Sequence, residues 1–171
     1  MELLEGLLTR RSIRRYKKQE VSDSQLELLI KAGMYAPSAV NKQPWHFIIF
    51  RNKETIDKII YFHQHADMLK NASAAILVCW DQLLQHDTGY GPVDCSAATQ
   101  NILLAAHDLG IGAVWVGIYP REQRMQAVHE LFRLPENIRP FSIISIGFPD
   151  EKKKQPDRFK PERIHYETWQ K

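Results

Sequence analysis

Hydrophobic positions recur along the chain with two periods, one typical of helices and one typical of strands. Leucines at helical spacing predict a short helix over residues 2–9. A second helix is predicted in VSDSQLELLIKAGMYAP, where Ser22 and Gln25 stand three residues apart as in a capping box. Its apolar face comprises Leu26, Leu29, Ile30 and Gly33. Pro37 ends this helix, and a polar loop begins.

The rest of the chain alternates between the two periods. Strands are predicted in WHFIIFRN, in SAAILVCWD, in GAVWVGIY and in FSIISIGFP. The second of these is a continuous apolar run, which is typical of a strand buried on both faces. Helices are predicted in KETIDKIIYFHQ, in PVDCSAATQNILLAAHDLG and in REQRMQAVHELFRL. This alternation predicts one layered domain of mixed α and β structure over residues 1–171.

The end of the chain differs from the rest. Residues 150–171 are polar, yet they include Phe159, Ile164, Tyr166 and Trp169. Disordered tails are poor in aromatic residues. We therefore expect an extended arm that packs on another surface, such as a second subunit.

Composition narrows the classes of function. The net charge is +3 in 171 residues, which does not indicate a dedicated nucleic-acid-binding protein but suits an anionic ligand. Cys79 and Cys95 cannot supply a disulfide scaffold and are expected to be structural, as in a reducing compartment. The first residues, MELLEGLLTRRS, lack the basic start of a signal peptide, and no apolar run reaches membrane-spanning length. The sequence thus predicts a cytoplasmic protein that does not act in a membrane.

A basic cluster follows the first predicted helix. It comprises Arg10, Arg11, Ser12, Arg14, Arg15, Lys17 and Lys18. Three interpretations stay open from the residues alone: a solvated edge, a nucleic-acid contact with few aromatic residues, or a compact phosphate site. Arginine side chains and a serine hydroxyl form charge-assisted hydrogen bonds with phosphate, which favours the third interpretation over the second.

Known catalytic and nucleotide-binding motifs are missing. GYGPVD lacks the third glycine of a dinucleotide fingerprint, and the chain has no phosphate-binding loop lysine, no G-x-S-x-G and no H-E-x-x-H. His63 and His65 are two residues apart, so on a helix they would point to different faces. A metal site is therefore not expected.

Two motifs together carry a family resemblance over the full length of the chain. TRRSIRRY contains an R-x-S-x-R element, and APSAVNKQPWHF follows it about 25 residues later. With GIGAVWVGIY and the ending RFKPERIHYETW, these segments resemble the nitroreductase family of flavin enzymes. The resemblance implies an α+β fold with a central, mainly antiparallel sheet flanked by helices. It also implies a homodimer with a swapped C-terminal arm and FMN at the subunit interface.

The resemblance assigns site residues by motif. Arg10, Arg11, Ser12 and Arg14 would form one subunit's share of the site. Arg10 and Ser12 would bind on the ribityl-phosphate side, and Arg14 would approach the pyrimidine edge of the flavin. The residues implied from the partner subunit's loop are Pro37, Ser38, Ala39, Asn41 and Gln43. His65 and Met68 occupy the region of the pyrimidine end, and Val116, Gly117 and Ile118 would lie along the ring. Arg158, or alternatively Lys160 or Arg163, would complete the phosphate site.

The implied activity is a ping-pong cycle, in which NAD(P)H reduces FMN and the reduced FMN then reduces an acceptor. Nitroaromatics, quinones or similar electron-poor small molecules would be the acceptors. No side-chain acid or base is required, because the cofactor carries the chemistry while Arg14 and the Gly117 backbone tune it. Dehalogenation, dehydrogenation and a non-catalytic flavin-binding role stay open as alternatives on the same fold.

Overall fold

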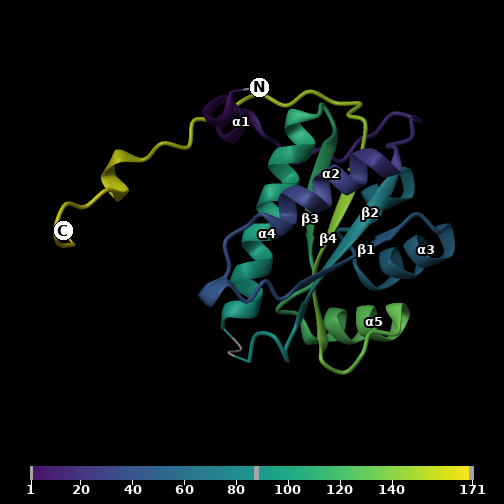
Figure 1. Cartoon of the computed structure of the whole chain (residues 1–171). Coiled ribbons are helices and arrows are strands. Elements are labelled where there is room, and N and C mark those ends of the chain that lie inside the picture. Colours follow the sequence, from purple (N-terminus) through teal and green to yellow (C-terminus); the bar gives the residue numbers. More distant parts are fainter. Residues whose placement is uncertain (1, 87–88, 170–171) are drawn as a thin grey trace.

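The computed structural model describes residues 2–86 and 89–169. Within them, four strands form one antiparallel sheet in the order β1-β2-β4-β3 (Figure 1). The strands are β1 (Trp45–Phe50), β2 (Ala74–Asp81), β3 (Gly112–Gly117) and β4 (Ile138–Gly147). The α+β class and the antiparallel sheet predicted from the sequence are therefore confirmed.

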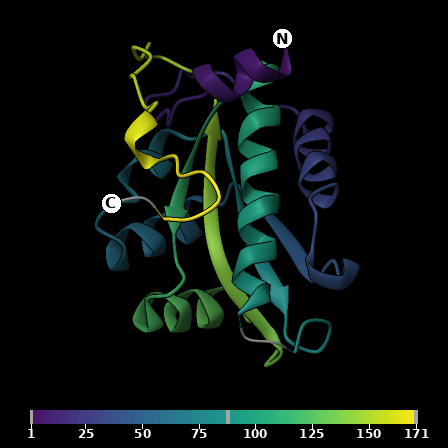
Figure 2. The ribbon, with the colours of Figure 1, turned by 90° about the vertical axis from the view of Figure 1, so that its left-hand side faces the viewer.

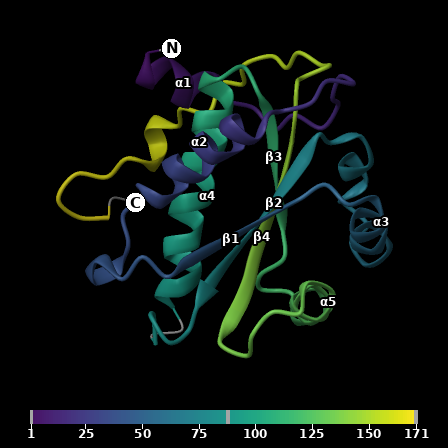
Figure 3. The same ribbon diagram turned by 45° about the vertical axis from the view of Figure 1, so that its right-hand side comes forward.

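Helices cover both faces of this sheet. They are α1 (Leu3–Thr9), α2 (Asp23–Met34), α3 (Lys53–Phe62), α4 (Tyr90–Asp108) and α5 (Glu122–Phe132). α4 crosses one face of the sheet and α2 packs on α4, whereas α3 and α5 lie on the other face (Figure 3). Short 3-10 turns at Ala39–Asn41, Asp67–Asn71 and Pro161–Arg163 were not predicted.

Local signals in the sequence account for the helix ends. The predicted capping box of α2 is present, because the Ser22 side chain accepts from Gln25 N–H while the Gln25 side chain accepts from Ser22 N–H. Pro92 lies in the first turn of α4, where a missing N–H costs nothing. Gly110, with φ +70°, follows the end of α4 in the left-handed conformation that glycine tolerates.

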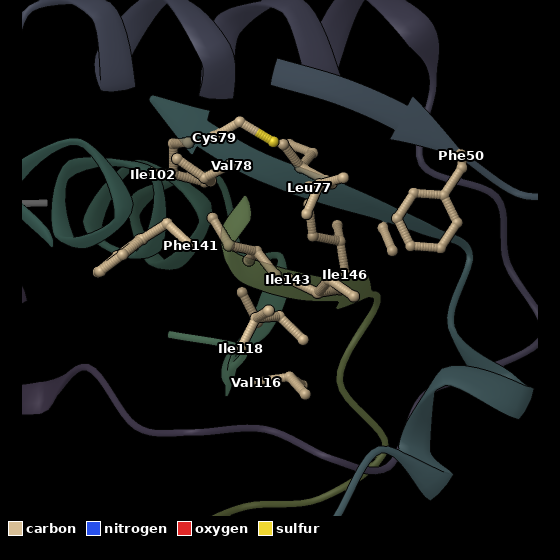
Figure 4. Packing of buried hydrophobic residues seen from close by; sticks show 14 of the residues in the cluster. Phe50, Leu77, Val78, Cys79, Ile102, Val116, Ile118, Phe141, Ile143 and Ile146 are labelled. Carbon is tan, nitrogen blue, oxygen red and sulfur yellow. The ribbon is translucent and has the colours of Figure 1, made fainter. Parts of the chain in front are cut away.

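One core fills the space between the sheet and its helices. β2 is buried along seven of its eight residues, as its continuous apolar run predicted. Figure 4 shows side chains of β2 and β4 gathered with Ile102 of α4 and Ile118, which follows β3. Burying large aliphatic side chains contributes about 1.5–3 kcal/mol each, so this cluster is the main source of stability.

The segment after α1 and the segment after β4 meet at the edge of the sheet beside β3. Ser12 bridges to Ala113, and Tyr16 bridges to Pro149. Beyond residue 151 the chain leaves this edge as an arm with one 3-10 turn (Figures 1 and 2). Within the described residues, no helix is long and apolar enough to cross a membrane.

Candidate functional site

A cleft of about 640 Å³ opens beside the end of β3. It is lined by Arg14, Arg15, His63, His65, Asp67, Met68, Asn71, Trp115, Val116, Gly117 and Arg124. Five of these residues were predicted as flavin contacts: Arg14, His65, Met68, Val116 and Gly117. They come from segments up to about a hundred residues apart, so the fold assembles them and no local spacing does.

Gly117 sets the width of the cleft. A Cβ placed on Gly117 would meet no atom of the described residues within 4 Å, so it would project into open space. Gly147 differs, because a Cβ there would approach the Tyr16 ring at 2.8 Å. Gly147 is thus a packing glycine, whereas Gly117 leaves room for a flat group to approach the backbone.

Ile118 lies away from the cleft. Its side chain is fully buried, and Figure 4 places it in the hydrophobic core. Successive side chains of an extended chain point to opposite sides, so Ile118 shares the core-facing side with Val116. The predicted contact of Ile118 with the ligand therefore reduces to its backbone, and Trp115 stands on the cleft side instead.

The carbonyl oxygen of Gly117 accepts two hydrogen bonds from side chains that were not predicted. His63 Nε2 lies 2.9 Å from this oxygen, and Arg124 Nη1 lies 3.1 Å from it. His63 Nδ1 accepts from the His65 N–H at 3.2 Å, which leaves the ring proton on Nε2 to donate to Gly117. Burial, opposed by this backbone hydrogen bond, holds the pKa of His63 below its usual value. A neutral His63 thus fixes the end of β3 at the cleft floor.

Neither His63 nor Arg124 carries a sequence signal for this role. His63 was considered only as a possible metal ligand and was rejected as one, and Arg124 belongs to a helix that was predicted from its apolar period. A search of the described residues finds no group of three His, Cys, Asp or Glu side chains that could hold a metal ion. The only feature of the sequence that could have drawn attention to His63 is its position two residues before His65, in the segment between α3 and a 3-10 turn.

A second cationic group lies where the arm leaves the body. Arg10 and Arg158 are close enough for mutual repulsion, and Arg11 adds to it. Burial first, and then these two positive charges, hold the pKa of Arg10 below its ordinary value. Arg11 and Arg158 also line a hollow of about 460 Å³ with Phe159. Guanidinium groups held together in this way would be stabilised by a bound anion such as phosphate.

The loop that was predicted to reach the partner's flavin, residues 37–43, lies outside the cleft and follows the C-terminal end of α2. Its residues Val40, Asn41 and Gln43 have positive φ angles of 52°, 55° and 48°. A β-branched residue is strained in this conformation, so Val40 costs on the order of 1–2 kcal/mol. Strain of this kind persists only where the surroundings hold it, and it gathers at functional sites.

Side-chain hydrogen bonds hold the strained loop. Ser38 Oγ accepts from Gln43 N–H at 2.9 Å, and the side chains of Gln43 and Asn41 are joined at 2.8 Å. Asp94 in the first turns of α4 is buried, and its Oδ1 accepts from Ala39 N–H at 2.9 Å. Its Oδ2 has no hydrogen-bond partner among the described residues. The loop is therefore fixed within one chain before anything binds to it. Asp94 helps to hold the loop, and the sequence analysis gave no indication of this role.

Replacing Val40 by asparagine is expected to stabilise the protein by about 1 kcal/mol. Asparagine adopts the left-handed conformation at lower cost, and Val40 is 89% exposed, so no packing within the chain is lost. Urea unfolding measures the change, with V93N as control, because Val93 is an exposed valine in ordinary helix. Destabilisation by V40N alone would contradict the prediction and indicate that a second chain contacts Val40.

The two cysteines are structural, as predicted. Both are free and buried, and burial raises the pKa of Cys79 to about 12. Burial also raises the pKa of Cys95, whose thiol donates to the Cys79 carbonyl. Protonated, enclosed thiols of this kind are poor nucleophiles. Thiol chemistry is thus excluded at the candidate site.

Comparison with known proteins agrees with the fold. The profile described as Nitroreductase family matches residues 7–148. A protein of Archaeoglobus fulgidus, provisionally named NADH dehydrogenase/NAD(P)H nitroreductase, is 51% identical over 98% of this chain and 99% of its own length. A crystal structure with the same provisional name, from Parabacteroides distasonis, has a TM-score of 0.95 and 38% identity, and covers 99% of both chains. An FMN-dependent nitroreductase of Clostridium difficile has a TM-score of 0.88 and 30% identity, covering 97% of this chain and 99% of that one. The chain therefore belongs to the nitroreductase family.

Proposed function

We propose that the protein is an FMN-dependent oxidoreductase that takes reducing equivalents from NAD(P)H and passes them to small electron-poor acceptors such as nitroaromatics or quinones. The observation that carries the proposal is the cleft, where five predicted contacts surround the open face of Gly117. The relatives named for FMN and for NAD(P)H support the same cofactors here. Bound FMN would accept hydride from the donor and reduce the acceptor in a second, separate step.

Arg14 and the backbone of Gly117 would tune the cofactor. Arg14 lines the cleft, and a guanidinium beside the pyrimidine edge would stabilise the negative charge that reduction places there. Two donors hold the Gly117 carbonyl, so the peptide groups at the end of β3 keep one orientation. Met68 and His65 would close the side of the cleft, and Val116 would contribute backbone.

The phosphate of FMN would bind at the second cationic group. Arg10, Arg11 and Ser12 lie within four residues before Arg14, and Arg158 adds a positive charge from the arm. Farther along the chain, Lys160 directly precedes the exposed 3-10 turn of the arm and Arg163 ends it. Arg158 is therefore the arm cation that we assign to the phosphate, with Lys160 and Arg163 as alternatives.

The site would be completed by a second copy of the chain, with FMN at the interface. Apolar side chains on α1 and on the arm are exposed: Leu3, Leu4, Phe159, Tyr166 and Trp169 are each at least two-thirds exposed. Such a surface is typical of an interface in an obligate dimer. The arm of one copy would pack on the other, and Pro37, Ser38, Ala39, Asn41 and Gln43 would reach the partner's flavin. Sedimentation that gives the mass of a single chain would contradict this assembly.

The remaining features fit one domain that works in the cytoplasm. A single core joins all strands and the helices that cover them, while residues 150–171 would serve as the arm. Two buried free thiols suit a reducing compartment. The N-terminal arginines lie at the cleft beside β3 and next to the arm, where we assign them to FMN, so no nucleic-acid contact is proposed for them.

A visible absorption spectrum of the purified protein tests the proposal. Flavin absorption that bleaches on anaerobic addition of NADH or NADPH, and returns on addition of a quinone, is the expected result. Retained FMN that neither donor bleaches would favour a non-catalytic flavin-binding role. A colourless protein that also fails to take up added FMN would overturn the proposal altogether.

A further inference from the structure

A second pocket adjoins the cleft at the N-terminal end of α5. Its volume is about 660 Å³, and its lining residues are Tyr61, Phe62, Gln64, His65, Arg121, Gln123 and Arg124. His65 and Arg124 line the cleft as well, so the two spaces adjoin at these side chains. In Figure 1, α3 and α5 lie on the opposite side of the sheet from the direction in which the arm extends. The arm of the same chain therefore leaves this pocket open.

The charges of this pocket have one sign. None of its described lining residues is acidic, and Arg121 and Arg124 contribute two guanidinium groups. Arg121 is exposed, and no carboxylate of the described residues forms an ion pair with either guanidinium. Arg124 donates one hydrogen bond from Nη1 to the Gly117 carbonyl, and the other N–H groups of its guanidinium stay available. The pocket thus offers planar donors without a competing carboxylate, which suits a phosphate.

The surroundings of this pocket differ from it in charge. A groove between α3 and α5 shares Tyr61 and Phe62 with it but also contains three acidic residues, Glu54, Asp57 and Glu130, beside Lys53 and Lys58. Glu122, the next residue after Arg121, lines a separate hollow on the other side of α5. A ligand that leaves the cleft past His65 and Arg124 therefore meets a basic pocket without acidic side chains first and surfaces of mixed charge beyond it.

We propose that this pocket binds the adenosine phosphate half of the electron donor and that it favours NADPH over NADH. The proposal rests on the proposed function, because the nicotinamide must lie in the cleft. Because His65 and Arg124 border both spaces, one elongated ligand would reach from the cleft into the pocket, which a free phosphate would not do. Arg121 would bind the 2′-phosphate that distinguishes the two donors, and the ring of Tyr61, 94% exposed, offers a face for the purine.

Replacing Arg121 by glutamine tests the inference in the FMN-loaded protein. We expect KM for NADPH to rise about 10-fold, since a charge-assisted bidentate contact is lost, while KM for NADH changes less than threefold. Reduced nicotinamide mononucleotide, which lacks the adenosine half, should be used equally well by R121Q and the unaltered protein. The matched control is R133Q, the same charge change at the other end of α5, which should alter none of these values.

A binding measurement separates this inference from the proposed function. Calorimetry with adenosine 2′,5′-bisphosphate needs no turnover, and we expect R121Q to weaken its binding about 10-fold while R133Q leaves it unchanged. Equal binding to R121Q and the unaltered protein, or an unchanged NADPH to NADH preference, would overturn the inference even if the flavin bleaches. Weaker bisphosphate binding by R121Q in a protein whose flavin no donor bleaches would support an anion pocket but overturn the proposed electron donor.

Discussion

Replacing Gly117 by valine is expected to abolish FMN binding while leaving the apoprotein folded. The new side chain would project into the cleft, where a Cβ meets no described atom within 4 Å. Valine is well suited to a strand and Gly117 has no positive φ, so the backbone accepts it. A flat ring that needs the same space would lose its contact with the β3 backbone. We expect FMN affinity to fall at least about 100-fold, which corresponds to about 3 kcal/mol.

Fluorescence titration with FMN measures this loss, and circular dichroism with urea unfolding shows whether the fold is kept. G117A should give an intermediate affinity, because one methyl group intrudes less than three carbons. The contrasting control is G147V, whose Cβ would approach the Tyr16 ring at 2.8 Å. That variant should lower the free energy of unfolding. FMN binding by G117V as tight as in the unaltered protein would mean that the flavin does not lie along Gly117.

The secondary structure could be predicted from the sequence because each element has its own hydrophobic periodicity and its own capping or turn residues at its ends. β4 shows where this reading fails, since the strand begins at Ile138 and the prediction began at Phe141. Arg139 and Pro140 looked like loop residues, because proline cannot donate to a ladder. In the structure Pro140 pairs with Cys79, beside an irregularity between Val78 and Cys79 in the register of β2 and β4. A bulge of this kind accommodates proline inside a sheet, and only the paired strand reveals it.

Part of the lining of the cleft was predictable through motifs and not through spacing. Family resemblance placed Arg14, Met68 and Gly117 in one site, and the fold brings them together around the cleft. His63 and Arg124 were missed because their hydrogen bonds to Gly117 join segments with no shared pattern. Ile118 was assigned to the flavin although strand alternation turns it into the core. Contacts between distant segments depend on tertiary packing, which a single sequence does not display.

The carboxylate of Glu151 links the arm to the cleft, and its removal is expected to loosen both. Glu151 Oε1 accepts from the N–H of Arg14 at 2.6 Å and from the N–H of Arg15 at 3.3 Å. Asp150 N–H donates to the Arg15 carbonyl beside them, so the arm begins as a short paired segment. Hydrogen bonds to a charged acceptor contribute about 1.5–3 kcal/mol, and Glu151 is only 17% exposed. E151A should therefore lower the free energy of unfolding by about 2 kcal/mol and weaken FMN binding through Arg14.

The pH dependence distinguishes the charge of Glu151 from its shape. Burial would raise the pKa of this carboxyl, but the Arg14 and Arg15 amides and the charge of Lys153 outweigh burial and hold it below the usual value. A lowered pKa in the folded protein stabilises the fold above the unfolded value of about 4.5, and this stabilisation disappears as pH falls through the folded value. E151Q keeps an acceptor oxygen but no charge, so it should be about 1 kcal/mol less stable than the unaltered protein at pH 7, with the difference vanishing in acid. Urea unfolding from pH 7 to pH 3 at one protein concentration measures this difference, with E162Q in the exposed arm as the matched control. A stability difference that stays constant with pH would show that Glu151 acts by packing and not by its negative charge.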